Sequence, residues 1–457
     1  MDILLLQPPN RGPSVLTLPP LGLAYLAAAL LKNGHSVQIL DAPASRLNLA
    51  QVAGKVREER PAALGLGGLT PNFDLTIEAI KKLRPFVRHV IVGGPHVSFF
   101  GAGLLDSVPE IDFLVIGEGE DTLPELLSAL DRGRNRGLPP GAISREHPKL
   151  VPRPPMADLN RIPFPARALL PYRRYRHPAS LSSPVTTLIA SRGCPYPCIF
   201  CVKTIHGSQA RFRGPENVAD EIETIVKDFR LRELIFYDDN FLFPPARAQA
   251  TLTEIIRRGL GISFRCEGRV DHVNPELLSL LKKAGCHTVT YGIETANPHG
   301  LEYLRKGFTV DQARKAVELT HQAGLRSGIY FILGIPTESP ADMEKTIAFA
   351  IKLNPFFAQF SILSPLPGSA LFPQIPGSRP LSSPRVKNPF DQDSARSFLP
   401  SGLWSESDLK RILKRAYLRF YLRPGFLRQA LKNQTWSSLF LSLRSLKQIL
   451  RWLLTNF

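Results

Sequence analysis

Cysteine is scarce in this sequence, with five residues among 457. So few cysteines cannot build the disulfide framework of a small secreted domain. Long apolar runs are also missing, because the longest candidate, residues 21–31, is shorter than the roughly 18 residues of a membrane span. No basic segment precedes the apolar residues that follow Met1, so no signal peptide is predicted. These absences predict a cytoplasmic chain whose domains fold around ordinary apolar cores.

The first third of the chain lacks the dinucleotide fingerprint Gly-x-Gly-x-x-Gly, so NAD and FAD are not supported. Its alternating apolar strands and helices predict instead a doubly wound, Rossmann-like α/β domain with a parallel sheet. The predicted strands are 2–7, 35–40, 62–66, 89–92 and 113–116, and the predicted helices are 22–33, 74–83 and 121–130. Ligands of such sheets bind at the carboxyl ends of the strands. Those ends carry Gly67, Gly68, Gly93 and Gly94, which either admit a ligand to the backbone or form tight turns.

A second series of strands and helices begins near residue 185. Its predicted strands are 185–190, 233–237, 263–268, 287–293, 327–333 and 357–363, and its predicted helices are 216–228, 245–258, 275–284, 311–323 and 340–353. Six such units predict a partial (β/α)6 barrel, smaller than the usual eight-stranded barrel of ~250 residues. We therefore predict a Rossmann-like domain, a linker rich in Pro, Arg and Ser, a partial barrel, and a basic helical C-terminal region, with the bounds 1–135, 136–184, 185–375 and 376–457.

Positive charge is concentrated at the C-terminal end of the chain. The formal net charge is +18, and from residue 401 onward eleven Lys and Arg residues face only Glu406 and Asp408. A basic tail can meet an anionic membrane, with Trp436 and Trp452 at the interface, or nucleic acid. A solvated helix face that packs on its own protein through its leucines explains the same pattern. Both interpretations stay open.

Three of the five cysteines, Cys194, Cys198 and Cys201, form a Cys-x3-Cys-x2-Cys loop after the first barrel strand. Cysteine thiolates bind iron well, and a [4Fe–4S] cluster normally takes four of them. Three thiolates leave one iron free to chelate S-adenosylmethionine (SAM) and to pass it an electron. The alternative is a structural zinc site that uses His206 as a fourth ligand. The isolated Cys266 and Cys286 are most simply small core residues.

This loop resembles the signature of the radical SAM superfamily, with the aromatic Phe200 just before the last cysteine. Further segments resemble that superfamily's later motifs in the right order; they are 236–241 (Phe-Tyr-Asp-Asp-Asn-Phe), 291–295 (Tyr-Gly-Ile-Glu-Thr), 331–338 (Phe-Ile-Leu-Gly-Ile-Pro-Thr-Glu, with Thr337 where glycine is usual) and 364–369 (Ser-Pro-Leu-Pro-Gly-Ser). The resemblance implies that Asp238, Asp239, Gly292 and Glu294 contact SAM. For the two aspartates, capping of the next helix is the other explanation.

The N-terminal domain resembles the cobalamin-binding domain fused to many radical SAM enzymes. The resemblance lies in residues 19–26, Gly93-Gly94-Pro95-His96 and Gly117-Glu118-Gly119-Glu120. It implies that Gly67, Gly68, Gly93 and Gly94 lie near cobalamin. The axial-ligand pattern Asp-x-His-x-x-Gly is absent after the first strand, where Gln7-Pro8-Pro9-Asn10 stands, so cobalamin would bind without a protein histidine below the cobalt.

Three other polar residues have a structural and a functional interpretation. We expect His96 to be a satisfied loop histidine rather than a ligand. Arg192 and Arg269 either contact the SAM carboxylate or substrate, or form ordinary salt bridges.

These patterns predict a radical SAM enzyme with a [4Fe–4S] cluster, SAM and cobalamin, which methylates a carbon of an organic substrate. A cyclase or rearrangement enzyme without methyl transfer, and a zinc-stabilised nucleic-acid-binding protein, are the alternatives. The expected partners are a flavodoxin or ferredoxin as electron donor and a small molecule, lipid or tetrapyrrole as substrate. Nucleic acid is not expected as a partner, and a peripheral membrane contact through the C-terminus stays open. The sequence does not identify the substrate or the oligomeric state.

Overall fold

The computed structural model describes residues 1–10, 17–133, 137–374, 404–424 and 426. These residues form two compact units. The first unit contains Met1–Tyr175, Val202–Arg211 and residues 366–374, the described part of Leu366–Ser397. The second contains Arg176–Cys201, Phe212–Pro365 and the helix α14 (Glu406–Tyr421). Residues 137–175, which fall within the predicted linker, group with the first unit.

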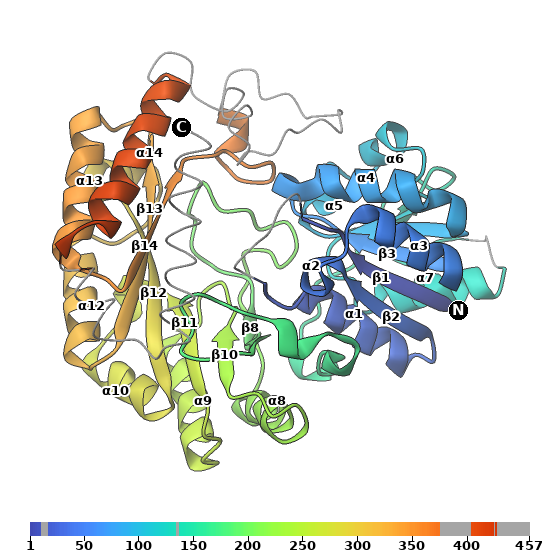
Figure 1. The fold of residues 1–457 in the computed structure, drawn as a ribbon, viewed down its shortest axis with the longest axis horizontal. Coiled ribbons are helices and arrows are strands. Elements are labelled where there is room, and N and C mark those ends of the chain that lie inside the picture. Colours follow the sequence, from blue (N-terminus) through green and yellow to red (C-terminus); the bar gives the residue numbers. More distant parts are fainter. Residues whose placement is uncertain (11–16, 134–136, 375–403, 425, 427–457) are drawn as a thin grey trace. The chain divides into compact units, whose positions relative to one another are not determined.

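The first unit is built on a six-stranded sheet of order β2-β1-β3-β4-β5-β6 (Figure 1). Its strands are β1 (Asp2–Gln7), β2 (Ser36–Asp41), β3 (Ala63–Gly67), β4 (His89–Gly93), β5 (Phe113–Val115) and β6 (Ala142–Ser144). The first five are parallel, as predicted, and β6 pairs antiparallel with β5. The sequence analysis missed β6, which is three residues long. The Rossmann-like α/β fold is confirmed.

Helices cover both faces of this sheet, since alternate residues of each strand point to opposite sides. Ile3 and Leu5 pack with one set of apolar side chains, and Leu4 and Leu6 pack with another. The first set includes residues of α1 and α7, and the second includes residues of α3, α4 and α6. The helices are α1 (Leu21–Lys32), α2 (Ala42–Ser45), α3 (Leu49–Glu59), α4 (Phe73–Leu83), α5 (Pro95–Phe100), α6 (Gly103–Ser107) and α7 (Thr122–Asp131).

The second unit is built on a six-stranded parallel sheet of order β14-β13-β12-β11-β10-β7. Its strands are β7 (Val185–Leu188), β10 (Glu233–Phe236), β11 (Ser263–Gly268), β12 (Cys286–Glu294), β13 (Arg326–Leu333) and β14 (Phe357–Ile362). Two short strands, β8 (Ser191–Arg192) and β9 (Arg211–Phe212), pair separately. Among the described strands β7 and β14 are unpaired at the two edges, so the predicted partial barrel is confirmed and remains open.

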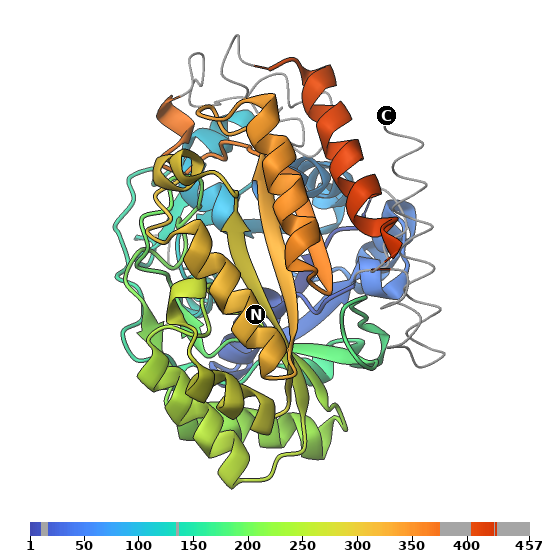
Figure 2. The same cartoon turned by 90° about the vertical axis from the view of Figure 1, so that its left-hand side faces the viewer.

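Helices line the outside of this partial barrel, and Figure 2 shows α12 and α13 in front of the strands. The helices are α8 (Pro215–Asp228), α9 (Pro245–Arg257), α10 (Pro275–Lys283), α11 (Pro298–Tyr303), α12 (Val310–Gln322) and α13 (Pro340–Leu353). Several begin with strong caps. Thr309 and Ser339, for example, each form a capping box with the residue three positions later. These helix starts follow directly from the sequence.

A pair of tyrosines on α14 covers the open edge of β14. The Tyr421 hydroxyl donates to the carbonyl of Ala358 at 2.7 Å and accepts from its N–H at 3.3 Å. The Tyr417 hydroxyl bonds in the same way to the carbonyl and N–H of Phe360, at 3.0 and 3.3 Å. An unpaired strand edge invites pairing with other chains. The two tyrosines, one helical turn apart, replace a neighbouring strand at this edge.

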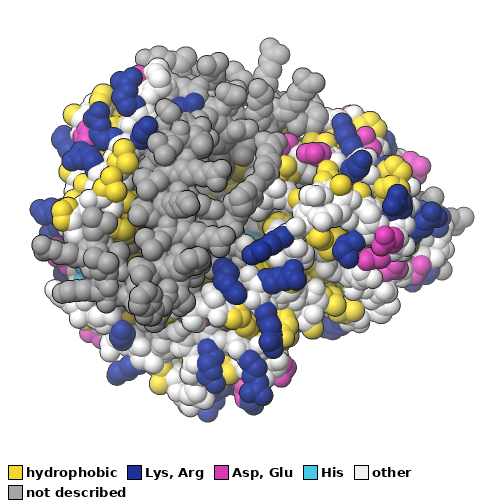
Figure 3. Space-filling view, in the orientation of Figure 1, with side chains coloured by type: hydrophobic (Ala, Val, Ile, Leu, Met, Phe, Trp, Pro, Cys, Tyr) yellow, Lys and Arg dark blue, Asp and Glu magenta, His cyan; other side chains and the backbone are white. Residues whose placement is uncertain are grey.

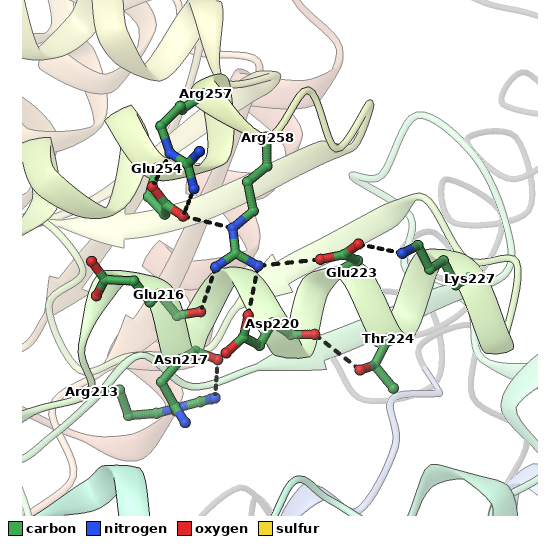
Figure 4. A network of polar contacts seen from close by, with 10 residues as sticks. All are labelled: Arg213, Glu216, Asn217, Asp220, Glu223, Thr224, Lys227, Glu254, Arg257 and Arg258. Carbon is green, nitrogen blue, oxygen red and sulfur yellow. Dashed lines mark hydrogen bonds and ion pairs between the residues drawn. The ribbon is translucent and has the colours of Figure 1, made fainter.

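Arg258 ties α8 to α9 through a network of charged side chains (Figure 4). Its guanidinium contacts Asp220 at 2.6 Å, Glu223 at 3.2 Å and Glu254 at 2.6 Å. Arg257 also bonds Glu254, and the hydrogen bonds to both arginines lower the pKa of this glutamate to about 2. The network lies on the outside of the barrel, so it stabilises the fold there.

The described part of the basic C-terminal region is α14. Figure 3 shows Lys and Arg side chains over the part of the second unit that carries α13 and α14. Arg415 and Arg419 pair with Glu344 of α13 at 2.6 and 2.5 Å. This helix therefore packs on its own protein. The predicted leucine stripe, Trp436 and Trp452 lie outside the described residues. Within the described part of the chain, no helix is both long and apolar enough to span a bilayer.

Candidate functional site

The motif residues of the second unit lie where its parallel strands end. The cysteine loop follows β7 and β8, Asp238 and Asp239 follow β10, and Glu294 is the last residue of β12. The carboxyl ends of parallel strands meet at one end of a barrel, where such enzymes place their active sites. The topology therefore brings together segments that are up to 100 residues apart in the sequence.

None of the three cysteines of the loop is in a disulfide; Cys194 and Cys198 are half-buried and Cys201 is exposed. A zinc ion would need its ligands around one point, at about 2.3 Å for sulfur. Across the described residues, no three His, Cys, Asp or Glu side chains converge in that way. In a cubane cluster each thiolate bonds a different iron, so the sulfurs are not gathered around one ion. The assignment of the three thiols to a cluster stays a prediction from their spacing.

Contacts within the second unit hold the cysteine loop in place. The Tyr196 ring lies 3.6 Å under the guanidinium carbon of Arg269, and its hydroxyl hydrogen-bonds His272. Arg269 in turn forms a two-pronged pair with Asp271, at 3.0 and 2.9 Å. Further along the loop, the Ile199 N–H donates to the Leu304 carbonyl at 3.3 Å. Arg269 therefore has the salt-bridge role that the sequence left open, and it also supports the loop.

The two aspartates after β10 lie in different environments. Asp238 is 3% exposed, accepts from the Ala190 N–H at 3.1 Å and from the Ser191 hydroxyl, and lies 3.9 Å from Arg247. Burial raises the pKa of Asp238, and the positive charge of Arg247 opposes that rise. Asp239 is exposed, and its carboxylate has no hydrogen-bond partner among the described residues. Asp238 thus fixes the segment that leads into the cysteine loop, and Asp239 remains open to a ligand.

Glu294 is held in a buried ion pair and an unusual backbone conformation. Its Oε1 lies 3.0 Å from the Lys306 Nζ, and both side chains are 7% exposed. Its φ is +71°, in the left-handed region where a residue with a Cβ is strained. A Cβ at Gly292 would lie 2.5 Å from Glu294 Oε1 and 3.4 Å from Lys306 Nζ, so any side chain there would displace the ion pair. Strain of this kind clusters at ligand sites, where the surrounding structure enforces it.

Lys306 was not singled out from the sequence. Besides pairing with Glu294, its Nζ lies 5.6 Å from the centroid of the Phe200 ring in the cysteine loop. The order of the sequence motifs gives no signal for Lys306, because its partner is twelve residues away on another element. Lys306 therefore connects the end of β12 with the cysteine loop.

Glu338, the last residue of the segment 331–338, is a third buried carboxyl at this end of the barrel, after Asp238 and Glu294. It is 4% exposed, accepts from the Thr295 hydroxyl, and has no partner for its Oε2 among the described residues. Burial raises its pKa to about 7. The Thr295 hydroxyl also bonds Thr346 at 3.1 Å and accepts from the Asn297 N–H at 3.0 Å. The carboxyl therefore orders the turn that follows Glu294.

The four glycines of the first unit differ in what surrounds them. A Cβ at Gly68 would lie 2.4 Å from the Phe73 ring, and one at Gly94 would lie 3.2 Å from the Gly68 backbone. Gly94 also has a φ of +98°. These two glycines are explained by packing and turn geometry. A Cβ at Gly93 would meet Val115 at 3.3 Å, whereas one at Gly67 would meet nothing within 4 Å. Gly67 is thus the position with room for a ligand.

The histidines weighed from the sequence are engaged within the protein. His96 is 2% exposed, stacks on Phe73 with 3.9 Å between ring centroids, and bonds the Thr70 hydroxyl at 3.2 Å. Burial lowers its pKa to about 3, so it stays neutral, as expected for a loop histidine. His206, the fourth ligand of the zinc alternative, bonds Glu118 through Nδ1 at 3.1 Å. Arg211 holds the same carboxylate at 2.7 and 2.9 Å.

The two remaining cysteines and Arg192 are buried. Cys266 and Cys286 are 0% and 3% exposed on the neighbouring strands β11 and β12. The Cys286 thiol and burial raise the pKa of the Cys266 thiol, which makes it unreactive. Both are core residues, as predicted. Arg192 is 5% exposed on β8.

Comparison with known proteins gives a consistent result. The radical SAM superfamily matches residues 188–350, and the B12 binding domain matches residues 11–127. An uncharacterized methyltransferase of Pyrococcus horikoshii is 33% identical over 437 residues, which cover 93% of this chain and 94% of that protein. The anaerobic magnesium-protoporphyrin IX monomethyl ester cyclase of Rubrivivax gelatinosus is 31% identical over 370 residues, 78% of this chain and 66% of the cyclase.

A solved structure shares the fold of both units. It is the radical SAM methyltransferase TsrM from Kitasatospora setae with cobalamin and a [4Fe–4S] cluster bound. Its TM-score to this chain is 0.70 and its sequence identity is 23%. The match covers 82% of this chain and 78% of the TsrM chain. The order of the sequence motifs, the architecture of the two sheets and the relative that matches along nearly its whole length all point to the same family. The chain belongs to the radical SAM enzymes that carry a B12-binding domain.

Proposed function

We propose that this chain is a cobalamin-dependent radical SAM methyltransferase that acts on a carbon of an organic substrate. The observation that supports this proposal most strongly is the similarity to the Pyrococcus horikoshii methyltransferase, which extends over 93% of this chain and 94% of that protein. The similarity to the cyclase spans only 66% of the cyclase, so a third of that enzyme has no counterpart here. Methyl transfer is therefore favoured over cyclisation.

The second unit provides the residues for the cluster and SAM. Cys194, Cys198 and Cys201 would hold the [4Fe–4S] cluster, and Tyr196 and Arg269 fix their loop. When bound, the cluster and SAM supply a 5′-deoxyadenosyl radical, and cobalamin supplies the methyl group. The open carboxylate of Asp239 would accept from the SAM amino group. Gly292 and Glu294, with Lys306 beside them, would shape the wall of the SAM site.

The first unit provides the cobalamin site. Gly67 and Gly93 pair across the ends of β3 and β4, and the open space at Gly67 allows a large ligand to reach the backbone. Gly68 and Gly94 shape this edge by packing on each other. Gln7-Pro8-Pro9 follows β1 and offers no histidine below the cobalt. These residues would therefore hold cobalamin without a protein histidine as a cobalt ligand.

The substrate is a small molecule, and the electron comes from an external donor such as flavodoxin or ferredoxin. Within the cysteine loop Ile199 is buried, and Tyr196 and Phe200 are half-buried, so these apolar side chains would limit contact of the cluster with water. The exposed Cys201 is the natural point at which an electron would enter. Neither nucleic acid nor a membrane is part of this proposal.

The test is anaerobic reconstitution with iron, sulfide and hydroxocobalamin, followed by reduction in the presence of SAM. The proposal predicts about four irons per chain, release of 5′-deoxyadenosine, and S-adenosylhomocysteine from the SAM molecule that gives up its methyl group. A cyclase would release 5′-deoxyadenosine without S-adenosylhomocysteine. One zinc and no iron would overturn the proposal.

A further inference from the structure

The inner face of the second sheet carries a polar cluster outside the motif segments. Arg265 and Glu267 lie on β11, and Tyr330 lies on β13. Side chains of a strand alternate between its two faces. On β12 and β13, Tyr291 and Ser327 hydrogen-bond Thr320 and His321 of α12, so they define the helix-covered face. Thr290 and Tyr330 therefore point to the inner face, where Arg265 and Glu267 meet them.

Hydrogen bonds fix these side chains against one another. The Tyr330 hydroxyl donates to Glu267 Oε1 at 2.8 Å, and the Arg265 Nη2 lies 3.6 Å from the same oxygen. Arg265 Nη2 also donates to the Thr290 hydroxyl at 3.3 Å, and its guanidinium lies 5.4 Å from the Phe357 ring centroid. The Arg265 side chain is 4% exposed, and its Nε has no partner among the described residues. The Arg265 Nη1 also donates to His177 Nε2 at 2.8 Å, so Glu267, Thr290 and His177 together hold the buried charge in place.

One carboxylate oxygen of Glu267 remains open. Oε1 takes both protein contacts, and Oε2 has none among the described residues. The side chain is 32% exposed, yet the surrounding barrel desolvates it enough to raise its pKa. The negative charge of Asp239 raises the pKa of Glu267 further. Tyr237, which is 59% exposed, also interacts electrostatically with Glu267. The open groups around Glu267 are thus acidic or neutral, while Arg265 is covered.

We infer that Glu267 anchors one end of the substrate, and that the anchored group is a positively charged hydrogen-bond donor such as a protonated amine. The inference rests on the proposed function, because it assigns a substrate to that reaction. Tyr330 and Arg265 act as positioning residues that turn Oε2 toward the interior of the barrel. A charge-assisted hydrogen bond to a fixed carboxylate is among the stronger polar contacts in proteins.

This arrangement discriminates among the substrate classes that the sequence left open. A hydrocarbon lipid would leave the open oxygen of Glu267 and the Tyr237 hydroxyl without partners, which is costly in a site that excludes water. A carboxylate-bearing tetrapyrrole would place negative charge against the Glu267 carboxylate. An amine-bearing small molecule or peptide residue satisfies that carboxylate and leaves Tyr237 free to contact the rest of the substrate.

The test uses the reconstituted holoenzyme and three probes that share a ring and differ in charge: 3-phenylpropylamine, 3-phenylpropanol and 3-phenylpropionate. Dissociation constants are measured anaerobically by ligand-observed NMR. The wild-type protein should bind the amine about tenfold more tightly than the carboxylate. Glu267→Gln should remove that preference, because it keeps the shape and loses the charge. Glu302→Gln, an exposed position on α11, is the matched control and should keep it.

Two results would overturn this inference: a wild-type protein that does not prefer the amine, or a preference that survives Glu267→Gln. Tyr330→Phe gives an independent check, because loss of one hydroxyl should weaken amine binding several-fold with no change in iron content. Failure of the proposed function would appear elsewhere, as missing cobalamin, 5′-deoxyadenosine or S-adenosylhomocysteine. Probe binding needs no turnover and can therefore be read in either case.

Discussion

The two sheets of this protein each have six strands, of which five are parallel in the first sheet and all six in the second, yet the carboxyl ends of their strands differ. The first sheet ends in glycines, including Gly67, Gly68, Gly93 and Gly94. The second ends in cysteines, carboxylates and a lysine, with Glu294 and Lys306 buried as a pair. The same architecture therefore serves two kinds of site. At the first, glycines leave room for a ligand beside the backbone, and at the second, reactive and charged side chains bind the ligand.

The difference follows from what each ligand needs. Cobalamin is a large cofactor that brings its own metal and ring, so the protein supplies room and a close approach of the backbone. A cluster and SAM need thiolates and charged partners held at fixed positions. Burying those groups costs stability, which the second unit offsets with ion pairs and with a support network for the cysteine loop.

Loss of a cluster ligand should produce the largest effect. Cys198→Ala leaves two thiolates, so iron should fall from about four per chain to nearly none. Formation of 5′-deoxyadenosine should fall below detection. Cys286→Ala, which alters a buried core cysteine, is the control and should retain iron. Iron and labile sulfide assays on both variants check this, and a variant that keeps its cluster would rule out the assigned ligands.

Breaking the buried ion pair should have the next largest effect. Lys306→Met leaves the Glu294 carboxylate buried without its partner, which typically costs about 3–5 kcal/mol. Chemical denaturation under anaerobic conditions measures the loss. The double variant Glu294→Gln with Lys306→Met removes both charges and should recover much of it. If the single variant were as stable as the wild type, the pair would not be buried as described.

Glu338 should make stability fall as the pH rises. Its pKa is raised from 4.5 to about 7 in the folded protein, so the folded state holds a proton that the unfolded state has lost. The free energy of unfolding should therefore decline between about pH 4.5 and 7, by at most about 3 kcal/mol. Glu338→Gln should flatten this decline. An unchanged pH profile in that variant would assign the dependence to another group.

Substitutions at two glycines of the first sheet should distinguish a role in packing from a role in ligand binding. Gly68→Val forces a side chain into Phe73 and should cost about 2 kcal/mol. Gly67→Val meets open space, so stability should change little while cobalamin binding weakens at least about tenfold. Thermal unfolding and cobalamin absorption measure the two effects. Equal losses of stability in both variants would contradict the difference between these positions.

The smallest effect should come from the covered edge of the second sheet. Tyr421→Phe removes hydroxyl bonds to Ala358 and should cost about 1 kcal/mol. Removing both Tyr417 and Tyr421 hydroxyls should also expose the edge of β14 and favour self-association. Sedimentation measures association, and a monomeric double variant of unchanged stability would show that other contacts protect the edge.

Sequence patterns predicted the strands well because each carries its own apolar signal. β1 and β11 have the predicted bounds 2–7 and 263–268, and the ends of β3 and β4 differ by one residue. β6 was missed because three residues carry too little pattern, and its pairing with β5 depends on tertiary contact. The cluster cysteines could be predicted because their spacing is local.

The rest of the site depends on contacts between distant residues. Nothing near Lys306 indicates a partner, and Asp238 and Asp239 are adjacent in sequence yet differ in burial. Arg265, Glu267 and Tyr330 look like ordinary alternating strand residues until β11 and β13 lie on either side of β12. Such juxtapositions come from the sheet order, which short-range patterns do not encode.

The central claim is that one chain carries two separate cofactor sites, and simultaneous measurement of iron and cobalt on the same reconstituted protein tests it most directly. The account predicts about four irons and one cobalt per wild-type chain. Cys198→Ala should lose iron and keep cobalt, and Gly67→Val should lose cobalt and keep iron. Wild-type protein without cobalt, or variants that lose both metals together while still folded, would contradict it.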